Sequence, residues 1–360
     1  MNTSARKIKV GIVGLGRIGR GHISELAKFP GKYEVVAVAD HAPDRFENLP
    51  AFAAEARQYP SLEALLEDPE VEMVNVCVRH PDHVPMGLKI VDAGKIAVIE
   101  KPVATSTAEM DLLRVADKAH PGHIFFRHNR RFEPAFIKVR ELIASGLIGE
   151  VQYIKLDRSV GFCRRNDWMT MTEFYGGLLS NWGPHLIDQA LRLLDSPVVE
   201  LWADVRRVVS IGDGDDLFKI ILRGENGRLA DIEVTGANTM PGREMEIIGN
   251  RGTIVYEGGN TISARTIDPS VELKDLKPHP ENPPLQYGNF DEKLYFVESK
   301  FQVPDGSMSD IWAKIYDAIA NGIPFEVTFD QAYEVVKITE EAFRKSGFKP
   351  ITNFKSKILN

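Results

Sequence analysis

The chain has 360 residues, 43% of them apolar and 26% charged, which is the composition of a folded globular protein and excludes a disordered or fibrous one. At about 150 residues per domain, this length predicts two domains. The 44 basic and 51 acidic residues give a formal net charge of -7, which disfavours nucleic acid as the main partner because no basic excess is present to neutralise phosphates.

Cysteine usage and the chain start indicate the class of protein. The only cysteines are Cys77 and Cys163, so a disulfide-rich scaffold is excluded, and Cys77 lies in an apolar run where we expect a buried, reduced thiol. The basic residues near the start are not followed by an apolar segment of signal-peptide length, and no run of about 18 apolar residues occurs. We therefore expect a cytoplasmic protein that has no membrane partner.

The first third of the chain alternates short β-branched runs with helical stretches, a pattern typical of parallel strands joined by crossover helices. The predicted strands are residues 8–13, 34–39, 73–78, 97–100 and 123–126. The predicted helices are residues 19–28, 61–67, 84–93 and 106–119, with Gly94 as the stop signal of the third. This part should form an α/β domain with a doubly wound parallel sheet.

After about residue 127 the pattern changes to longer alternating strands without crossovers, which predicts an α+β domain with a large open, mostly antiparallel sheet. The predicted strands are residues 151–160, 198–209, 217–222, 229–235 and 244–248, with tight turns at 225–227 and 249–252. Residues 268–287 contain five prolines and should form a surface excursion. Helices over 308–321 and 330–345 are expected to complete the fold.

A G-x-G-x-x-G motif at Gly14, Gly16 and Gly19 directly follows the first predicted strand and opens the first helix. In this context the glycines allow a tight turn, close approach of a pyrophosphate and close helix packing, while the helix N-terminus attracts the anion. Asp40 ends the second strand about 20 residues beyond the motif, the offset of a carboxylate that binds the ribose hydroxyls. The alternative for Asp40 is an ordinary turn residue.

The carboxylate of Asp40 favours NAD, because it would repel the 2′-phosphate of NADP. His41, Arg45 and Arg17 could approach the same pocket and pair with a phosphate, so NADP use stays possible.

Glu100-Lys101-Pro102 stands at the carboxyl end of a predicted strand, the edge of an open α/β sheet where ligands bind. In a partly desolvated cleft, the ammonium of Lys101 could polarise a hydroxyl or carbonyl oxygen, and its pKa could fall into a working range. The alternative is a solvated lysine beside a rigid proline turn.

A second cluster runs from Gly176 to Leu191. If it is one helix, Asn181, His185 and Asp188 share a polar strip opposite leucines, although Gly183-Pro184 could start or kink the helix there. His185 suits proton transfer near neutral pH, and Asp188 could orient it. The alternative is a hydrogen-bonded histidine in a core.

Other segments give weaker signals. Residues 127–131 (Arg-His-Asn-Arg-Arg) could present cations to a substrate or begin a charged interdomain helix, and residues 162–168 combine two arginines with Trp168, a set that suits a sugar face or an acidic substituent. His22, His120, His123 and His279 show no metal-ligand spacing, so we expect no metal.

Together these motifs resemble the glucose-fructose oxidoreductase, inositol dehydrogenase and MocA family over nearly the whole chain. They are the glycine motif, Asp40, Glu100-Lys101-Pro102, Arg130-Arg131-Phe132-Glu133-Pro134, Gly146-Leu147-Ile148-Gly149-Glu150, and Gly176-Gly177 followed by His185 and Asp188. The resemblance implies a Rossmann domain over residues 1–126, a substrate-binding and oligomerisation domain over 127–360, and redox chemistry on sugars or polyols. A homodimer or homotetramer formed through the second sheet is implied in the same way.

The resemblance also assigns roles to residues. Lys101 and His185 would be the catalytic pair, with His185 as the acid/base and Lys101 assisting it. The residues expected to bind the cofactor are Gly14, Gly16, Arg17, Ile18, Gly19, Asp40, His80, Glu100 and Lys101. Those expected to bind the substrate are Lys101, Arg130, Trp168, Asn181, His185 and Asp188.

Two positions depart from the family pattern. Asn181 stands where many members carry an aspartate, so a carboxylate is replaced by a neutral amide. The loop that usually reads close to Thr-Pro-Asn-x-x-His is here His80-Pro81-Asp82-His83, which alters groups near the nicotinamide ribose.

We interpret the sequence as an NAD-dependent dehydrogenase or reductase acting on a carbohydrate or cyclitol. Two alternatives stay open. One is a glycosidase that oxidises and re-reduces its sugar with bound NAD, and the other is a non-enzymatic regulator that responds to NAD or sugar.

Overall fold

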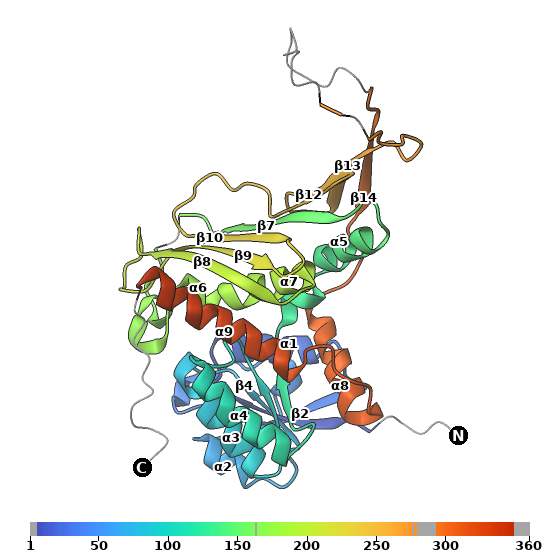
Figure 1. Cartoon of the computed structure of the whole chain (residues 1–360). Helices are drawn as coiled ribbons and strands as arrows, with labels where there is room; N and C mark the ends of the chain where they lie inside the picture. The colour runs from blue at the N-terminus through green and yellow to red at the C-terminus, as the bar shows by residue number, and fades with distance from the viewer. Residues whose placement is uncertain (1–5, 163, 276, 279–292, 349–360) are drawn as a thin grey trace, which may run out of the picture.

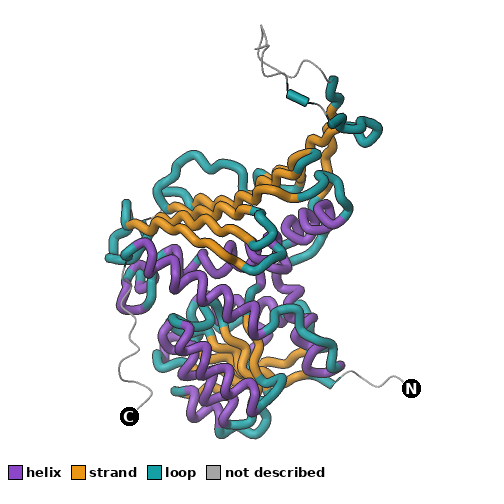
Figure 2. Tube along the Cα trace, viewed as in Figure 1, coloured by secondary structure: helices purple, strands orange, loops and turns teal. Residues whose placement is uncertain are grey.

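The structure is a computed structural model that describes residues 6–162, 164–275, 277–278 and 293–348. It contains two sheets, one built from the first part of the chain and one from the second (Figure 1). Helices lie around the first sheet and between the two sheets (Figure 2). No helix in the described ranges is both long and apolar enough to cross a membrane.

The first sheet has six parallel strands in the order β3-β2-β1-β4-β5-β6. The order of the strands along the sheet switches direction between β1 and β4, although the strands stay parallel. Its strands read as near-continuous apolar runs because helices cover both faces. The strands are β1 (Ile8–Val13), β2 (Tyr33–Ala39), β3 (Arg57–Tyr59), β4 (Met73–Val76), β5 (Ile96–Ile99) and β6 (Ile124–Phe126). The helices are α1 (Arg17–Leu26), α2 (Leu62–Leu66), α3 (His83–Asp92) and α4 (Thr107–Ala119).

The second sheet has eight strands in the order β14-β13-β12-β11-β7-β10-β9-β8, antiparallel except for the β7/β10 pair. Alternate residues are buried, as in β9, because helices cover only one face (Figure 2). The strands are β7 (Val151–Ser159), β8 (Val198–Arg206), β9 (Leu217–Gly224), β10 (Leu229–Thr235), β11 (Met245–Gly249), β12 (Gly252–Tyr256), β13 (Thr261–Ile267) and β14 (Phe296–Gln302). The helices of this part are α5 (Pro134–Ala144), α6 (Leu178–Asn181) and α7 (Gly183–Leu194).

The last two helices tie the halves of the chain together. Helix α8 (Ile311–Asn321) returns to the first core, where Trp312 is fully buried. Helix α9 (Phe329–Ser346) shares its side chains between both cores, since Ala332 and Val336 belong to the first and Val335 and Ile338 to the second.

The predicted fold class, a doubly wound parallel sheet followed by a large, mostly antiparallel sheet, is confirmed, with differences at particular elements. Strand β3 was not predicted, because a three-residue edge strand with two exposed residues carries no apolar run. Strands β12 to β14 and helix α5 were also missed. Half of the expected excursion over 268–287 falls outside the described residues, and its described part forms neither helix nor strand.

The burial of Trp312 generates a stability prediction. Its indole N–H donates to Glu25 at 2.7 Å, and its ring makes edge contacts with His22 and Tyr33. Trp312→Ala should lower the free energy of unfolding by about 3–5 kcal/mol, through lost burial and a cavity. The control Val115→Ala, at a 70% exposed position of α4, should change it by less than about 0.5 kcal/mol. Urea denaturation of both variants measures this, and equal midpoints would contradict the assigned packing.

Candidate active site

The glycine motif forms a tight bend between β1 and α1. Gly14 has a φ of +89°, and a Cβ there would lie 2.3 Å from the carbonyl oxygen of Cys77. A Cβ on Gly19 would lie 1.9 Å from the carbonyl oxygen of Gly14, whereas one on Gly16 would meet nothing within 4 Å. The backbone at Gly16 is therefore open to close approach, and no side chain caps the N-terminus of α1. These features fit a bound pyrophosphate.

Asp40 lies beside this bend at the end of β2. Its carboxylate accepts hydrogen bonds from the backbone N–H of Leu15 at 2.7 Å and of Ala42 at 3.0 Å. Each oxygen keeps a second lone pair, so the carboxylate can still accept bonds from ribose hydroxyls. Arg17, His41 and Arg45 line the same cleft.

The cleft extends from the glycine bend to the end of β5 and has a volume of about 1060 Å³. Ile18 lines its outer part, and Glu100 and Lys101 line its inner part. Its far rim comes from the segment after β7, where Arg165 and Asp167 form an ion pair of 2.6 Å next to Trp168. Residues from both halves of the chain therefore enclose one cleft.

His80 connects these two walls. Its Nδ1 lies 2.9 Å from the carbonyl oxygen of Tyr175, and its ring meets Trp168 edge to face at 4.9 Å between centroids. Since that carbonyl can only accept, Nδ1 carries the proton and Nε2 is left as an acceptor. Burial, then the charges of His83 and Lys101, lower the pKa of His80 well below 6.5, so the ring is neutral.

Lys101 projects from the end of β5 and reaches the second half of the chain. Its ammonium donates to the side-chain Oδ1 of Asn181 at 2.6 Å and to the carbonyl oxygen of the same residue at 3.0 Å. Asn181 is held by α6, which starts after Gly177 and is anchored by the backbone N–H of Leu179 donating to Asp215 at 2.8 Å. Burial lowers the pKa of Lys101 to about 8, with Glu100 opposing the fall and nearby arginines adding to it.

His185 lies in the first turn of α7 and is 8% exposed. Burial, then the charges of Lys101 and Arg130, lower its pKa well below 6.5, so its imidazole is neutral at pH 7. Within the described residues, its buried Nδ1 has no hydrogen-bond partner, and neither has either ring nitrogen of the neighbouring His128.

Two expectations for this segment are corrected. Residues 176–191 do not form one helix, because Trp182 separates the short α6 from α7 and Pro184 stands in the first turn of α7. Asp188 does not orient His185: its buried carboxylate is bound by both Nε and Nη2 of Arg131, the former at 3.0 Å. Arg131 outcompetes the histidine because a guanidinium fork matches a carboxylate in charge and shape.

The arginines of segment 127–131 are internally paired, and none of them lines the cleft. Arg131 also donates to Gln331 and to the carbonyl oxygen of Glu326, which joins α7 to α9. Arg130 pairs with Glu133 at 3.2 Å and lies over the ring of Trp182. Both arginines contribute to the field around the site and to domain packing.

A buried network below Lys101 was missed by sequence reasoning. The carboxylate of Glu100 is bound by Arg127 at 2.6 Å and by Nε2 of His22 at 2.9 Å. Burial alone would raise the pKa of Glu100, but Arg127, His22 and Lys101 hold it well below its usual range. Cys77, the only described cysteine, is half-buried and lies 3.3 Å from Nδ1 of His22. Cys163 lies outside the described residues.

No local signal in the sequence indicates that Glu100 binds His22, which is 78 positions away, or Arg127, which is 27 positions away. Only the knowledge that β5 and β6 are neighbours, with α1 packed on the same side, brings His22 and Arg127 to Glu100. In the described ranges, no group of three or more histidine, cysteine or carboxylate side chains is arranged to hold a metal ion.

Comparisons with known proteins agree with this arrangement. The model described as "Oxidoreductase family, NAD-binding Rossmann fold" matches residues 8–122, and the model described as "GFO/IDH/MocA C-terminal domain" matches residues 136–255.

Among curated proteins, the chain is 30% identical to inositol 2-dehydrogenase 2 of Saccharopolyspora erythraea, over 72% of this chain and 76% of that protein. It is 26% identical to scyllo-inositol 2-dehydrogenase (NADP(+)) of Bacillus subtilis, over 95% and 94%. Among solved structures, an NAD-binding protein from Listeria innocua superposes with a TM-score of 0.77 at 25% identity, over 95% of each chain.

The glycine bend gives a prediction with a matched control. Gly19→Ala should weaken NAD binding by about tenfold or more, because the contact with the Gly14 carbonyl must be relieved by moving the loop, at a cost above about 1.4 kcal/mol. Gly21→Ala, two residues along the same helix, meets nothing within 4 Å and should leave NAD affinity unchanged. Titration of both variants with NAD, followed calorimetrically, tests this, and equal affinities would argue against pyrophosphate binding at the bend.

Proposed function

Because the chain belongs to the GFO/IDH/MocA oxidoreductase family, with an NAD-binding Rossmann fold, we propose that it is an NAD-dependent dehydrogenase acting on a hydroxyl of a sugar or cyclitol. The relatives named inositol dehydrogenases support this substrate class. We also propose residues 1–126 as the cofactor domain and 127–360 as the domain for substrate and oligomer contacts.

The observation that carries the proposal is the contact between Lys101 and Asn181. It brings a cation at the end of β5, the ligand-binding edge of the Rossmann sheet, against the segment that leads into His185. An ammonium that lines the dinucleotide cleft and a neutral imidazole close enough to feel its charge are the groups that alcohol oxidation requires.

The residues of the cleft fit the cofactor. Gly14, Gly16 and Gly19 with the start of α1 would hold the pyrophosphate, and Asp40 the adenosine ribose. His80 offers a neutral acceptor nitrogen towards the inner cleft. NAD supplies the hydride chemistry between nicotinamide and the substrate carbon.

The chain's own groups would manage the proton. In the oxidising direction, the neutral imidazole of His185 accepts the hydroxyl proton, and the ammonium of Lys101 stabilises negative charge on the same oxygen. In the reducing direction the imidazolium returns the proton. Asn181 holds Lys101 in place through its amide oxygen, and Trp168 at the rim offers an apolar face for a sugar ring.

Cofactor preference follows from the same cleft. Asp40 favours NAD by repelling a 2′-phosphate, while Arg17 and Arg45, which form no ion pair with any described carboxylate, permit a weaker use of NADP.

The test of the function is NADH formation, read by absorbance, with NAD or NADP and a panel of inositols, aldoses, sugar acids and glycosides. NADH produced with an inositol or a sugar supports the dehydrogenase. Release of an aglycone that requires NAD without net NADH would replace it by the redox-assisted glycosidase. Tight binding of NAD or sugar without turnover would favour a regulator.

The two catalytic candidates generate a prediction on turnover. His185→Ala and Lys101→Ala should each lower kcat by about 10²–10⁴-fold, since each removes a group that acts on the reacting oxygen. The affinity for NAD should change little in His185→Ala, because the glycine bend and Asp40 are untouched. Steady-state kinetics and an NAD titration measure both, and undiminished kcat in either variant would remove that residue from the mechanism.

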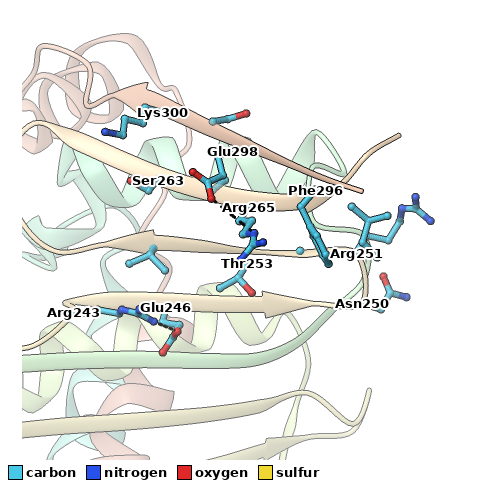
Figure 3. A pocket seen from close by; sticks show the side chains of 15 residues that line it. Arg243, Glu246, Asn250, Arg251, Thr253, Ser263, Arg265, Phe296, Glu298 and Lys300 are labelled. Carbon is cyan, nitrogen blue, oxygen red and sulfur yellow. Dashed lines mark hydrogen bonds and ion pairs between the residues drawn. The ribbon is translucent and has the colours of Figure 1, made fainter. Parts of the chain in front are cut away.

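We further propose a homodimer or homotetramer that forms through the uncovered face of the second sheet. The strand register aligns Ile248, Thr253, Arg265 and Glu298 across β11 to β14 on that face. A groove of about 880 Å³ follows these strands, and side chains of both charges stand beside Phe296 in it (Figure 3). A surface that mixes both signs with exposed apolar groups can pair with a second copy of itself about a two-fold axis.

Light scattering after gel filtration tests this interface. The wild-type chain should elute as a dimer or tetramer, and Phe296→Glu, at a 50% exposed position of β14, should shift it towards the monomer by placing a charge in the desolvated face. The control Val115→Glu, on a helix of the first half, should leave the mass unchanged. A monomeric wild-type chain would overturn the proposal.

A further inference from the structure

The ammonium of Lys101 has neutral partners only. Its hydrogen bonds go to the amide oxygen and the backbone oxygen of Asn181, and in the described ranges no carboxylate forms an ion pair with it. The nearest acid in the chain, Glu100, is the preceding residue, and its side chain points elsewhere. Lys101 is half-buried, and a lysine that is partly withdrawn from water without a counter-ion is uncommon, because desolvation penalises its charged form.

Arg127 explains why Glu100 is not available. One carboxylate oxygen of Glu100 accepts from Arg127 at 2.6 Å and from His22 at 2.9 Å, and the other accepts from the backbone N–H of Lys101 at 3.0 Å. Both oxygens are therefore turned away from the ammonium. Arg127 binds this carboxylate in preference to Lys101, because a guanidinium donates several hydrogen bonds in a fixed geometry and is always charged.

Arg127 is itself held rigidly. It is 4% exposed, binds Glu25 through its second terminal nitrogen, and lies 5.3 Å from the ring of Trp312, whose N–H binds the same carboxylate at 2.7 Å. The guanidinium therefore cannot turn towards the cleft, and Glu100 cannot follow Lys101.

Other charged and titratable groups face Lys101 from every neighbouring element. These are Glu100 on its own strand end, Arg127 and Arg130 after β6, Arg165 on the rim, His80 and His83 before and at the start of α3, and His185 on α7. Burial is the main cause that lowers the pKa of Lys101; the charge of Glu100 opposes the fall, and the arginines add to it.

We propose that Arg127 and Asn181 are positioning residues that together keep Lys101 without a carboxylate partner, so that no ion pair stabilises its charged form. The consequence for catalysis rests on the proposed function. The charge state of Lys101 does not, and it can be measured without turnover.

The direct test is competitive labelling of the full chain with acetic anhydride across pH, with and without NAD, followed by mass spectrometry of the peptide that contains Lys101. The midpoint of its reactivity should lie near pH 8, in line with the pKa of about 8, against about 10.4 for an ordinary lysine. A midpoint in the range of an ordinary lysine would overturn the proposal.

Variants distinguish the effects of Arg127 and Asn181 on the midpoint of Lys101 reactivity. Asn181→Asp places a carboxylate on the ammonium and should raise the midpoint by about one pH unit or more, while the neutral control Asn181→Ala should not raise it. Arg127→Met should raise it as well, by releasing Glu100 and by removing a cation, and should raise it by less in a Glu100→Gln background, where only the loss of the cation remains. If Arg127→Met does not fold, the comparison of Asn181→Asp with Asn181→Ala still tests the proposal. An unmoved midpoint in Asn181→Asp would contradict it.

The kinetic readout adds the link to function. If the Lys101 ammonium assists the reaction, kcat/KM should fall as pH rises through about 8, and Asn181→Asp should move that fall to higher pH. An enzyme that forms no NADH with any substrate would refute the proposed function while the labelling still decides the inference. A normal turnover combined with an ordinary lysine midpoint would refute the inference alone.

Discussion

The buried pairing of Glu100 with Arg127 is the constraint on which the site depends. A carboxylate and a guanidinium, both less than a tenth exposed, can be buried only with each other and with further hydrogen bonds, which His22, Glu25 and Trp312 supply. These partners come from α1 and from α8, and Arg127 itself follows β6. The order of the strands and the return of α8 are therefore prerequisites of the chemistry at the end of β5.

Above this network, the site depends on two carboxylates being held away from the candidate catalytic groups. With Glu100 engaged below and Asp188 engaged by Arg131, the two acids closest to Lys101 and His185 in the chain are withdrawn from them. The candidate catalytic groups keep neutral neighbours such as Asn181 and His80. Removal of competing charges leaves both groups free to respond to a substrate oxygen.

Local signals were enough to predict much of this fold. The apolar runs, Gly94 and the glycine motif identified five of the six strands of the first sheet and its bend, because each depends on neighbouring residues. The long-range pairings were beyond such signals. Nothing near Asp188 in the sequence indicates that Arg131, 57 residues away, binds it. The candidate site residues were proposed from motifs, but their partners are set by topology.

Helix α9 has a mechanical consequence. Its side chains belong to both hydrophobic cores, and Gln331 on it accepts from Arg131. A pivot of one half of the molecule against the other would pull apolar side chains such as Val335 or Val336 out of one core into water, at roughly 1.5–3 kcal/mol for each large side chain. Helix α9 therefore joins the two sheets into one frame and opposes a hinge motion that would separate the two walls of the cleft.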